Sequence, residues 1–379
     1  MRDTKYRALV ETLKGSVLGG KYGNGNPFPS VRALIRRYGL SNTTVLHALG
    51  ELERQGLISR KQGRGTLVIH RGASRKIGLI VPGVAYSEFF PPVVSAISCH
   101  SQQKGYQLLF GDIVSKSPER RVRAARAFAQ GLVDEGVAGV LYQPLELVDD
   151  AVRVNREILS VFDRADIPVV ILDNDFLPCP HRGGYDVVGI DNVAAGSLVA
   201  EHLVACGARR ISFQKRPRCS ASVNARLRGV VSALAVRRGA YRCSALEAEP
   251  DDREAVRRHL RAFRPEAFVC GNDTAAVALK QTLESLGRRV PDDVLLAGFD
   301  DVRYAKIVLP QLTTIRQPCE LIGATAFDRL LARIEKPDLA PLQIALPIEL
   351  VVRGSTARVK SRSDRMRTRE VKDREKDKA

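Results

Sequence analysis

The chain lacks tryptophan altogether, and aromatic residues make up only 6% of its 379 residues. It also lacks any apolar run that approaches the roughly 20 residues of a membrane-spanning helix, and its first six residues contain no apolar signal segment. Its seven cysteines (99, 179, 206, 219, 243, 270 and 319) include no CxxC pair, which argues against a disulfide framework or a zinc site. We therefore expect a soluble cytoplasmic protein with no membrane segment, metal or cofactor.

The signature motifs of several enzyme classes are missing as well. The sequence contains no HExxH, P-loop or GxSxG segment. An enzyme that uses Asp173 with Asp175, or Asp300 with Asp301, as an acid–base pair or as metal ligands remains an alternative. Adjacent aspartates at one strand end rarely point at the same atom, so we expect a protein without catalytic residues.

Positive charge is concentrated in two parts of the chain. Of the net charge of +18, residues 1–76 carry +11 and residues 357–379 carry +5, so the long segment 77–356 keeps only +2. A basic segment joined to a nearly neutral body is typical of a nucleic-acid-binding domain attached to a domain with another task. A solvated basic surface is the alternative. The segment 357–379 has too few apolar residues to offset chain entropy, so we expect a disordered tail.

The segment 29–68 explains most of the charge near the start of the chain. A short helical pattern (Ser30 to Tyr38) is followed by a turn at Gly39, a second helical pattern (Ser41 to Gln55) and a hairpin with a basic, glycine-rich tip at 61–65. An amphipathic helical pattern from about Thr4 to Leu18 precedes these elements. Helix, tight turn, helix and basic hairpin together predict a winged helix-turn-helix, which places its second helix in a DNA major groove.

The second of these helices is the expected recognition helix. Ser41 suits its N-cap and Gly56 the position after its end. Asparagine can bond adenine at two points, and threonine can contact a base edge or a phosphate. Capping, turn formation and solvation are the alternative roles for these residues. The candidates for DNA contact are Arg32, Ser41, Asn42, Thr43, Thr44, His47, Arg64 and Gly65.

From residue 77 onward the chain alternates apolar strand patterns with amphipathic helical patterns. Strands that are apolar throughout and separated by helices predict an α/β fold with parallel sheets covered on both faces. About 280 residues are large for one open sheet and suit two lobes. The expected strands are 77–81, 106–110, 137–142, 168–172, 187–190, 210–213, 267–270 and 294–299, and the clearest helices are 118–134, 193–205 and 273–286.

Polar and aromatic residues follow several of these strands, where ligands bind in such folds. Carboxylates and amides bond hydroxyl groups, and aromatic rings cover sugar C–H faces, so this set is typical of a pocket for a polyhydroxylated ligand. An Asp after a strand is also often a helix N-cap, and we expect this of Asp191 and Asp273. Phe89 and Phe90 could instead be core. The residues in question are Tyr86, Phe89, Phe90, Asp173, Asn174, Asp175, Asp191, Arg226, Asn272, Asp273, Asp300 and Asp301.

Two parts of the chain resemble two different protein families. Residues 4–70 resemble the GntR-type winged-helix family through Pro29-Ser30-Val31-Arg32-Ala33-Leu34, Ser41-x-Thr43-Thr44-Val45 and Gln62-Gly63-Arg64-Gly65-Thr66. This resemblance implies DNA contacts by Arg32, Thr43, Thr44 and Gly65.

Residues 77–356 resemble the effector domain of LacI/GalR repressors, which is related to periplasmic sugar-binding proteins. The matching motifs are Ile77-Gly78-Leu79-Ile80-Val81, Asp191-Asn192-x-x-x-Gly196, His202-Leu203-x-x-x-Gly207, Arg226-x-x-Gly229, Asn272-Asp273, Gly298-Phe299-Asp300-Asp301, Leu312-Thr313-Thr314-Ile315 and Pro347 to Thr356. The resemblance implies that Asp173, Arg226, Asn272 and Asp300 bind the effector. The winged helix and a short linker stand where that family has its own helix-turn-helix and hinge helix.

These observations predict a ligand-responsive transcriptional repressor. We expect a winged head at 1–70, a linker at 71–76, a two-lobed effector-binding and dimerisation domain at 77–356 and the tail at 357–379. The expected partners are double-stranded operator DNA, a second copy of the chain and a small effector, most simply a sugar, with Phe89, Phe90, Asp173, Arg226, Asn272 and Asp300 as its contacts. A constitutive DNA-binding protein whose body only dimerises is the other alternative.

Overall fold

The computed structural model describes residues 2–18, 21–22, 26–61, 65–68, 76–84, 87–115, 117–237 and 239–357. The linker at 71–75, the tail beyond 357, Arg64 and Tyr86 lie outside the described residues. None of the helices in the described part of the chain combines the length and apolar character needed to cross a bilayer.

The N-terminal head has the predicted order of helix, helix, helix and hairpin. Ser30 and Ser41 are the N-caps of the second and third helices, because their side chains accept hydrogen bonds from the backbone N–H groups of Ala33 and Thr44. Gly39 ends the second helix in the left-handed conformation, with φ of 62°. The elements are α1 (Arg2–Leu18), α2 (Val31–Tyr38), α3 (Asn42–Arg54) and the antiparallel pair β1 (Ile58–Lys61) and β2 (Gly65–Val68).

A small apolar core holds these elements together. Side chains at helical spacing on α1 and α3 are fully buried against Leu34 of α2 and the wing strands, which explains why this short segment can hold its shape. The buried set includes Leu9, Leu13, Val17, Leu34, Val45, Leu49, Leu52, Ile58 and Val68.

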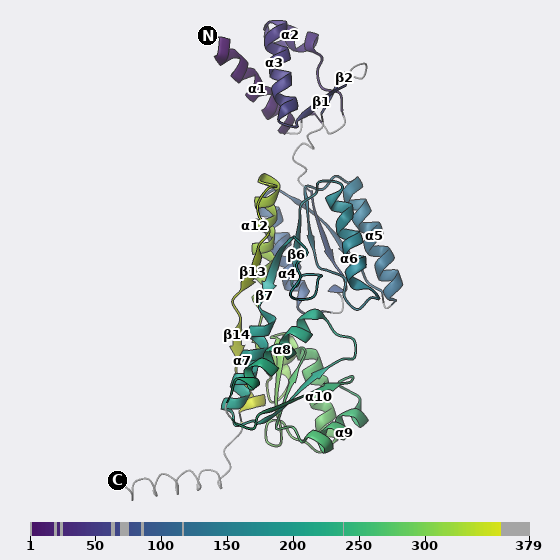
Figure 1. Cartoon of the computed structure of the whole chain (residues 1–379), viewed down its shortest axis with the longest axis vertical. Helices are drawn as coiled ribbons and strands as arrows, with labels where there is room; N and C mark the ends of the chain where they lie inside the picture. Colours follow the sequence, from purple (N-terminus) through teal and green to yellow (C-terminus); the bar gives the residue numbers. More distant parts are fainter. Residues whose placement is uncertain are drawn as a thin grey trace, which may run out of the picture.

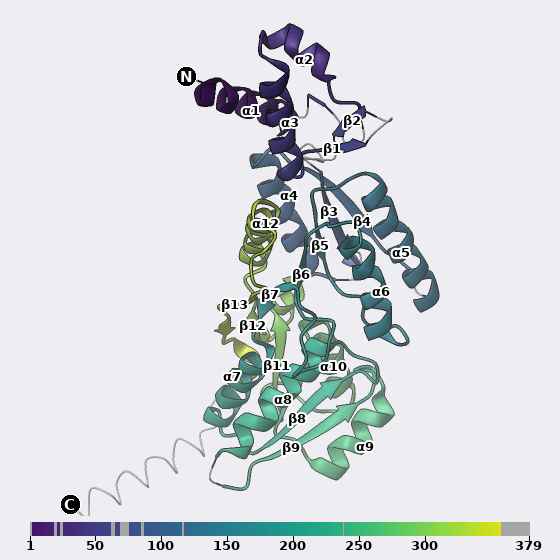
Figure 2. The same ribbon diagram turned by 45° about the horizontal axis from the view of Figure 1, so that its top comes forward.

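The body consists of two α/β lobes, each built on a six-stranded sheet, stacked along the long axis of the molecule (Figures 1 and 2). The first lobe has the strand order β13-β7-β6-β5-β3-β4, and all its neighbouring strands are parallel. Its strands are β3 (Lys76–Val81), β4 (Gln107–Asp112), β5 (Gly139–Tyr142), β6 (Val169–Leu172), β7 (Asp186–Ile190) and β13 (Gln343–Leu346). Its helices are α4 (Phe90–Gln103) and α12 (Cys319–Glu335) on one face and α5 (Pro118–Asp134) and α6 (Ala151–Asp163) on the other.

The second lobe repeats this plan with the strand order β14-β12-β11-β10-β8-β9 and one antiparallel pair at the β14 edge. Its strands are β8 (Arg210–Lys215), β9 (Arg242–Glu247), β10 (Ala267–Cys270), β11 (Leu295–Asp300), β12 (Thr313–Arg316) and β14 (Glu349–Val351). Its helices are α7 (Asn192–Ala205) and α8 (Ala221–Ala235) on one face, α9 (Arg253–Phe263) and α10 (Asp273–Ser285) on the other, the short α11 (Arg303–Ile307) and the 3-10 turn η2 (Gly354–Thr356).

The chain crosses between the lobes three times, from β7 to α7, from β12 to α12 and from β13 to β14. The β13–β14 crossing runs along one side of the molecule beside the end of α12 (Figure 1). The three crossings form the hinge side, and the loops after β5, β6, β8, β10 and β11 face each other across the space between the lobes.

All eight predicted strands of the body are present, with ends that differ by a few residues. The helix expected at 118–134 is α5 itself. Four strands were not predicted: β9, β12, β13 and β14. Exposure explains three of these omissions, because β9, β13 and β14 lie at sheet edges and lack a continuous apolar run. The fourth strand, β12, is internal and mostly buried, but Thr313 and Thr314 interrupt its apolar character.

A buried ion cluster fixes β13 and α12 to the first lobe. Asp186, at the start of β7, is inaccessible to solvent and accepts hydrogen bonds from Arg329 Nε at 2.8 Å and Arg333 Nε at 2.5 Å. The backbone N–H of Leu342 donates to the same carboxylate at 2.7 Å. One side chain therefore links β7 to the last helix and to the edge strand that follows it.

Candidate functional site

Two adjacent cavities lie between the lobes. The acidic cavity, of about 250 Å³, is lined by Gln143, Glu146, Asp173, Asn174 and Asp175 from the first lobe and by Cys219, Ala221 and Asn224 from the second. The basic cavity, of about 210 Å³, is lined by Leu147 from the first lobe and otherwise by the second lobe, including Gln214, Lys215, Arg216, Arg218 and Asn272. They share Leu147 and Cys219, so they are neighbouring parts of one interlobe cleft.

Arg226 is a buried cation beside this cleft, and it lines neither of the two cavities. Its side chain, on α8, is buried, with 4% of its surface exposed. Nε donates to Asn192 Oδ1 at 2.9 Å, Nη1 donates to the Gly271 carbonyl at 2.7 Å, and Nη2 lies 3.4 Å from Asp300 Oδ1. The guanidinium also lies over the Phe299 ring, 4.6 Å from its centroid. These contacts hold the Arg226 guanidinium in one orientation, near the carboxylates of Asp300 and Asp173.

The position of Arg226 follows from a close crossing of two helices. A Cβ on Gly196 of α7 would lie 2.0 Å from the Arg226 carbonyl oxygen, and a Cβ on Gly229 of α8 would lie 2.0 Å from the Val193 carbonyl oxygen. Only glycine permits this approach. Two motifs that are far apart in the sequence, Asp191-Asn192-x-x-x-Gly196 and Arg226-x-x-Gly229, therefore meet as one contact that brings Asn192 to Arg226.

The two aspartates at the end of β11 have different environments. Asp300 lies near Arg226 and accepts a hydrogen bond from Gln317 Nε2 at 2.7 Å, and it lines neither cavity. Asp301 is turned away and pairs with Arg316 at 2.8 Å and Arg353 at 2.6 Å. Both have positive φ, 107° and 52°, a costly conformation for aspartate. They cannot act together on one ligand atom, which removes the geometric basis for a catalytic pair there.

Asp173 and Asp175 also have different environments, although both line the acidic cavity. The carboxylate of Asp175 accepts hydrogen bonds from the backbone N–H groups of Leu177 and Gly183 at 3.0 and 2.9 Å. Asp175 therefore holds the loop that connects β6 to β7.

The acidic cavity contains two carboxyl groups that are hard to ionise. Burial raises the pKa of Glu146 to about 7, and the nearby charge of Asp173 adds to the rise. Burial likewise raises the pKa of Asp173 to about 6, although Arg226 opposes this and Asp300 adds to it. Glu146 Oε1 accepts a hydrogen bond from the backbone N–H of Ala221 at 2.8 Å, so this acid also joins the two lobes.

We expect Glu146 to make stability depend on pH. Its pKa is raised from 4.5 to about 7, so the folded state binds the proton more tightly than the unfolded state. Stability should fall as pH rises through this interval, and each pKa unit corresponds to about 1.4 kcal/mol. Glu146→Gln should therefore raise the melting temperature at pH 8 and have little effect at pH 5. Thermal unfolding across this range is the measurement, with Glu157→Gln on the exposed face of α6 as the control. Equal shifts at both pH values would contradict the assignment.

Buried polar atoms without a partner gather at the cleft. Among the described residues, the side-chain atoms that are buried and make no hydrogen bond include Gln143 Oε1, Asn174 Nδ2, Gln214 Oε1 and Gln317 Oε1. The first two belong to the acidic cavity, the third to the basic cavity, and Gln317 donates to Asp300. Such groups cost free energy unless water or a ligand satisfies them. The cleft therefore presents both acceptors and a donor for a hydroxylated molecule.

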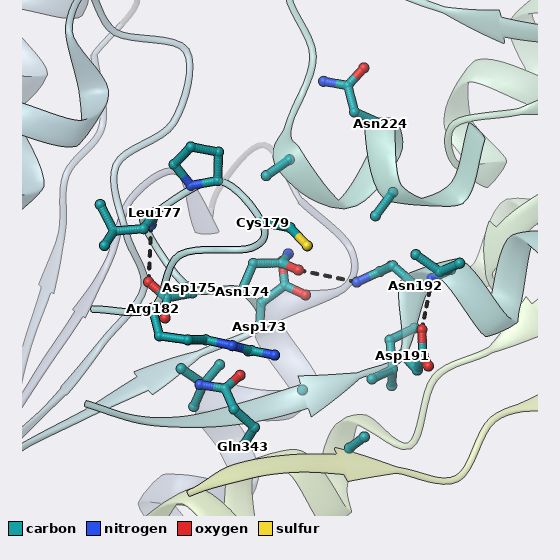
Figure 3. Close-up of a pocket in the computed structure, with 18 of the residues that line it drawn as sticks. Asp173, Asn174, Asp175, Leu177, Cys179, Arg182, Asp191, Asn192, Asn224 and Gln343 are labelled. Carbon is teal, nitrogen blue, oxygen red and sulfur yellow. Dashed lines mark hydrogen bonds between the residues drawn. The ribbon is translucent and has the colours of Figure 1, made fainter. Parts of the chain in front are cut away.

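A third cavity, of about 470 Å³, opens on the hinge side (Figure 3). It shares Asp173 and Asn174 with the acidic cavity. Figure 3 shows Asn174 hydrogen-bonded to Asn192, with a distance of 3.2 Å between Oδ1 and Nδ2. Because Asn192 begins α7 and also bonds Arg226, this contact connects the first lobe, the hinge and the second lobe.

Of the remaining predicted effector residues, Phe89 and Phe90 lie in the core, and Asn272 lies at the basic cavity. Phe89 and Phe90 pack edge to face in the core beside α4, with 8% and 7% of their surfaces exposed. Asn272 lines the basic cavity and its Oδ1 accepts from the backbone N–H of Ala275. Effector contact by these three residues stays a prediction.

The expectation of two aspartate caps is half right. Asp191 caps α7 through the N–H groups of Val193 and Ala194. Asp273 does not cap α10, because Asn272 holds that position. Asp273 is instead buried and accepts a hydrogen bond from Thr314 Oγ1 at 2.7 Å.

Sequence reasoning missed Gln143, Glu146, Asn192 and Gln317. Gln143 and Glu146 follow β5 and obey the same strand-end rule that selected Asp173, so that rule, applied to glutamine and glutamate, would have found them. Asn192 belongs to the motif Asp191-Asn192-x-x-x-Gly196, which was recognised, but Asn192 was not predicted as a site residue. Gln317 had no signal, because its strand was not predicted.

The DNA-facing candidates lie on α2, α3 and the wing. Arg32, Asn42 and Thr43 are exposed, and Thr44 Oγ1 lies 2.8 Å from Ser41 Oγ within the N-terminal turn of α3. His47 is exposed and its ring lies 4.7 Å from that of Tyr6. Gly65 begins β2 with φ of 80°. A polar, solvent-facing first turn is the part of such a helix that enters a groove.

Fold and site together define a DNA-binding head joined to a two-lobed ligand-binding body. Residues 5–68 match the model of the gntR family of bacterial regulatory proteins, and residues 200–356 match that of the periplasmic binding protein-like domain. The chain thus combines a GntR-family winged helix with a periplasmic-binding-protein-like body, as the sequence predicted.

Two curated relatives align with most of this chain. The chain is 26% identical over 372 residues to the arabinose metabolism transcriptional repressor of Geobacillus stearothermophilus. This alignment covers 94% of this chain and 98% of the relative. It is 27% identical over 285 residues to the ribose operon repressor of Escherichia coli K12, and this alignment covers 74% of this chain and 81% of the relative. Both relatives are named as repressors, in agreement with the prediction of a regulator without catalytic residues.

A solved structure shares the fold of the body. A LacI family transcriptional regulator from Enterococcus faecium, with bound ribose, aligns with a TM-score of 0.59 and 24% identity, covering 75% of this chain and all of that one.

Proposed function

We propose that this protein is a ligand-responsive transcriptional repressor that binds operator DNA in the cytoplasm and is controlled by a small polyhydroxylated effector bound between its lobes. The observation that carries the proposal is the set of unpartnered buried polar atoms at the interlobe cleft of a chain that begins with a winged helix. Relatives named for arabinose and ribose support a sugar as the effector.

The site residues of this proposal are Arg226, Asp173 and Asp300 at the cleft, with Glu146 and Asn192 added from the structure. Carboxylates, amides and a fixed guanidinium bond hydroxyl groups in the way that sugar recognition needs. Contacts between the lobes, such as Glu146 to the Ala221 N–H, make ligand occupancy and lobe closure parts of one equilibrium. An effector that binds one degree of closure better than another shifts that equilibrium.

We also propose that the working form is a homodimer, because paired winged helices match a pseudo-palindromic operator. Tyr304, Ile307 and Leu309 form an exposed apolar strip on and after α11, with 43%, 60% and 78% of their surfaces exposed. Such a strip suits burial against a second copy. Light scattering of the purified protein tests this, and a monomer at micromolar concentration would contradict it.

Replacement of Arg32 tests the DNA-binding head. Arg32→Ala should weaken binding to a fragment of the protein's own promoter by about 10- to 150-fold, because one charge-assisted hydrogen bond to DNA is lost. The variant should retain ligand binding, and the salt dependence of DNA binding should become shallower. Arg258→Ala, which removes the same charge from the exposed face of α9, is the matched control. If both variants bind DNA equally, Arg32 has no role at the interface.

The decisive experiment measures promoter binding with and without each member of a sugar panel. A sugar that raises the melting temperature and lowers DNA affinity supports the proposal. A protein that binds DNA but neither binds nor responds to any small molecule would favour a constitutive DNA-binding protein instead.

A further inference from the structure

The cleft has opposite electrostatic character in its two cavities. Among the residues that the structure describes, the charged ones lining the acidic cavity are Glu146, Asp173 and Asp175, with no lysine or arginine. The charged residues of the described lining of the basic cavity are Lys215, Arg216 and Arg218, with no aspartate or glutamate. A ligand that spans both therefore meets carboxylates at one end and cations at the other.

Two helices begin at the basic cavity. Ser220, the N-cap of α8, and Asn272, the N-cap of α10, both line it. These helices have 15 and 13 residues, long enough to carry a full macrodipole. Their N-termini place partial positive charge at the same end of the cleft as the three cationic side chains. The N–H groups of Ala221, Val223 and Ala275 already donate to Glu146, Ser220 and Asn272, so the other N–H groups of these first turns are the ones left for an anion.

A separate feature of this cavity points to a ligand. Gln214 is fully buried and lines the basic cavity; its Nε2 donates to the Ala248 carbonyl at 2.9 Å, whereas its Oε1 has no partner. A buried acceptor of this kind needs a donor such as a hydroxyl group. The cavity thus offers sites for an anion and for an adjoining hydroxyl.

The three cations already have surface partners, but these leave donors available. Lys215 Nζ lies 3.2 Å from Glu247, Arg216 Nε lies 3.0 Å from Glu249, and Arg218 pairs with Asp149. The carboxylates of the two arginine pairs are more than half exposed, so these ion pairs are weak. An ammonium has three N–H donors and a guanidinium five, so each cation can bond an anion as well.

We propose that the basic cavity is an anion subsite, and that the effector is a polyol carrying a terminal phosphate, such as a sugar phosphate. Its hydroxyl end lies in the acidic cavity, and its phosphate lies against Lys215, Arg216 and the N-termini of α8 and α10. This inference rests on the proposed function, because it concerns the effector of the same cleft. It narrows the ligand class from sugars in general to their phosphate esters.

The position of the subsite also gives it a part in lobe closure. Leu147 brings the first lobe to the cavity, and Arg218 pairs with Asp149 across the cleft. Gly271, whose carbonyl accepts a hydrogen bond from Arg226, lines the cavity too. An anion bound here therefore lies beside a residue that positions the buried Arg226.

The test uses the full chain and matched pairs of ligands at constant ionic strength. D-ribose, D-arabinose and D-glucose are compared with ribose 5-phosphate, arabinose 5-phosphate and glucose 6-phosphate by calorimetry and thermal shift, and inorganic phosphate serves as the minimal probe. We expect at least one ester to bind about 10- to 100-fold more tightly than its neutral parent. Inorganic phosphate should stabilise the protein more than chloride does.

Two double variants locate the effect. Lys215→Gln with Arg216→Gln should remove most of the preference for the ester and the stabilisation by phosphate. Arg258→Gln with Arg261→Gln, which removes two positive charges from α9, should keep both. Equal loss in the two variants would mean a general charge effect and would overturn the proposal.

The outcomes separate this inference from the proposed function. A neutral sugar that binds as tightly as its ester and alters promoter binding would leave the repressor standing and overturn the anion subsite. Phosphate binding that depends on Lys215 and Arg216, with no ligand affecting DNA, would support the subsite and contradict ligand control. If neither phosphate nor any ester binds, the subsite is absent.

Discussion

Replacing Asp186 with alanine should lower the free energy of unfolding by about 3–5 kcal/mol, the cost of breaking a buried ion pair. Asp186 is fully buried and holds Arg329 and Arg333, whose side chains are only 13% and 15% exposed. Alanine would leave both guanidinium groups without their counter-charge and the Leu342 N–H without its acceptor. We expect β13 and the C-terminal half of α12 to loosen first.

A surface acid with the same number of partners provides the comparison. Glu157 also pairs with two arginines, Arg126 and Arg153, but its side chain is 42% exposed. Glu157→Ala should cost less than about 1 kcal/mol. Thermal and urea unfolding followed by circular dichroism measure both variants. A similar, small loss in the two would show that the Asp186 cluster adds no more than a surface pair.

Replacing Arg226 with alanine should abolish the response to effector while DNA binding without effector persists. The variant loses the hydrogen bonds to Asn192 and Gly271 and the cation beside Asp300. Loss of one partner of a buried charge pair costs about 2–5 kcal/mol of affinity, or roughly 30- to 5,000-fold in Kd. The measurements are effector titration by calorimetry and promoter binding at saturating effector.

Arg258, on α9, offers a control. It is exposed and lines none of the three cavities, so Arg258→Ala removes an equal charge without touching the cleft. Arg226→Met keeps much of the side-chain volume and distinguishes loss of charge from collapse of the helix crossing at Gly196 and Gly229. An Arg226 variant that still binds effector with normal affinity would remove this residue from the site.

Local patterns in the sequence predicted much of the fold. Ser41 was recognised as a cap because a serine oxygen satisfies an N–H group within three residues, and no distant contact is needed. The buried parallel strands were found because both of their faces are covered, which makes them apolar throughout. Edge strands such as β9 and β13 lack that signature, and their pairing depends on distant residues.

The site was only partly accessible to the same reasoning. The strand-end rule selected Asp173, which lines the acidic cavity, and also Asp300, but it could not separate Asp300 from Asp301. Their carboxylates differ only because Arg316 and Arg353, from later in the chain, pair with the second one. It also could not show that Asn272, and not Asp273, caps α10.

The sequence by itself determined the DNA-binding head, the α/β class of the body, its division into two lobes and the families to which these parts are similar. Those features depend on periodicity, capping and composition, which act over a few residues at a time. Only the tertiary structure decided which polar groups meet. The crossing of α7 and α8 joins Asn192 to Arg226, the approach of the lobes joins Glu146 to the Ala221 N–H, and the ends of β8 and β10 gather the basic cavity. The physical reason is that burial and charge at these positions are set by neighbours tens to more than a hundred residues away.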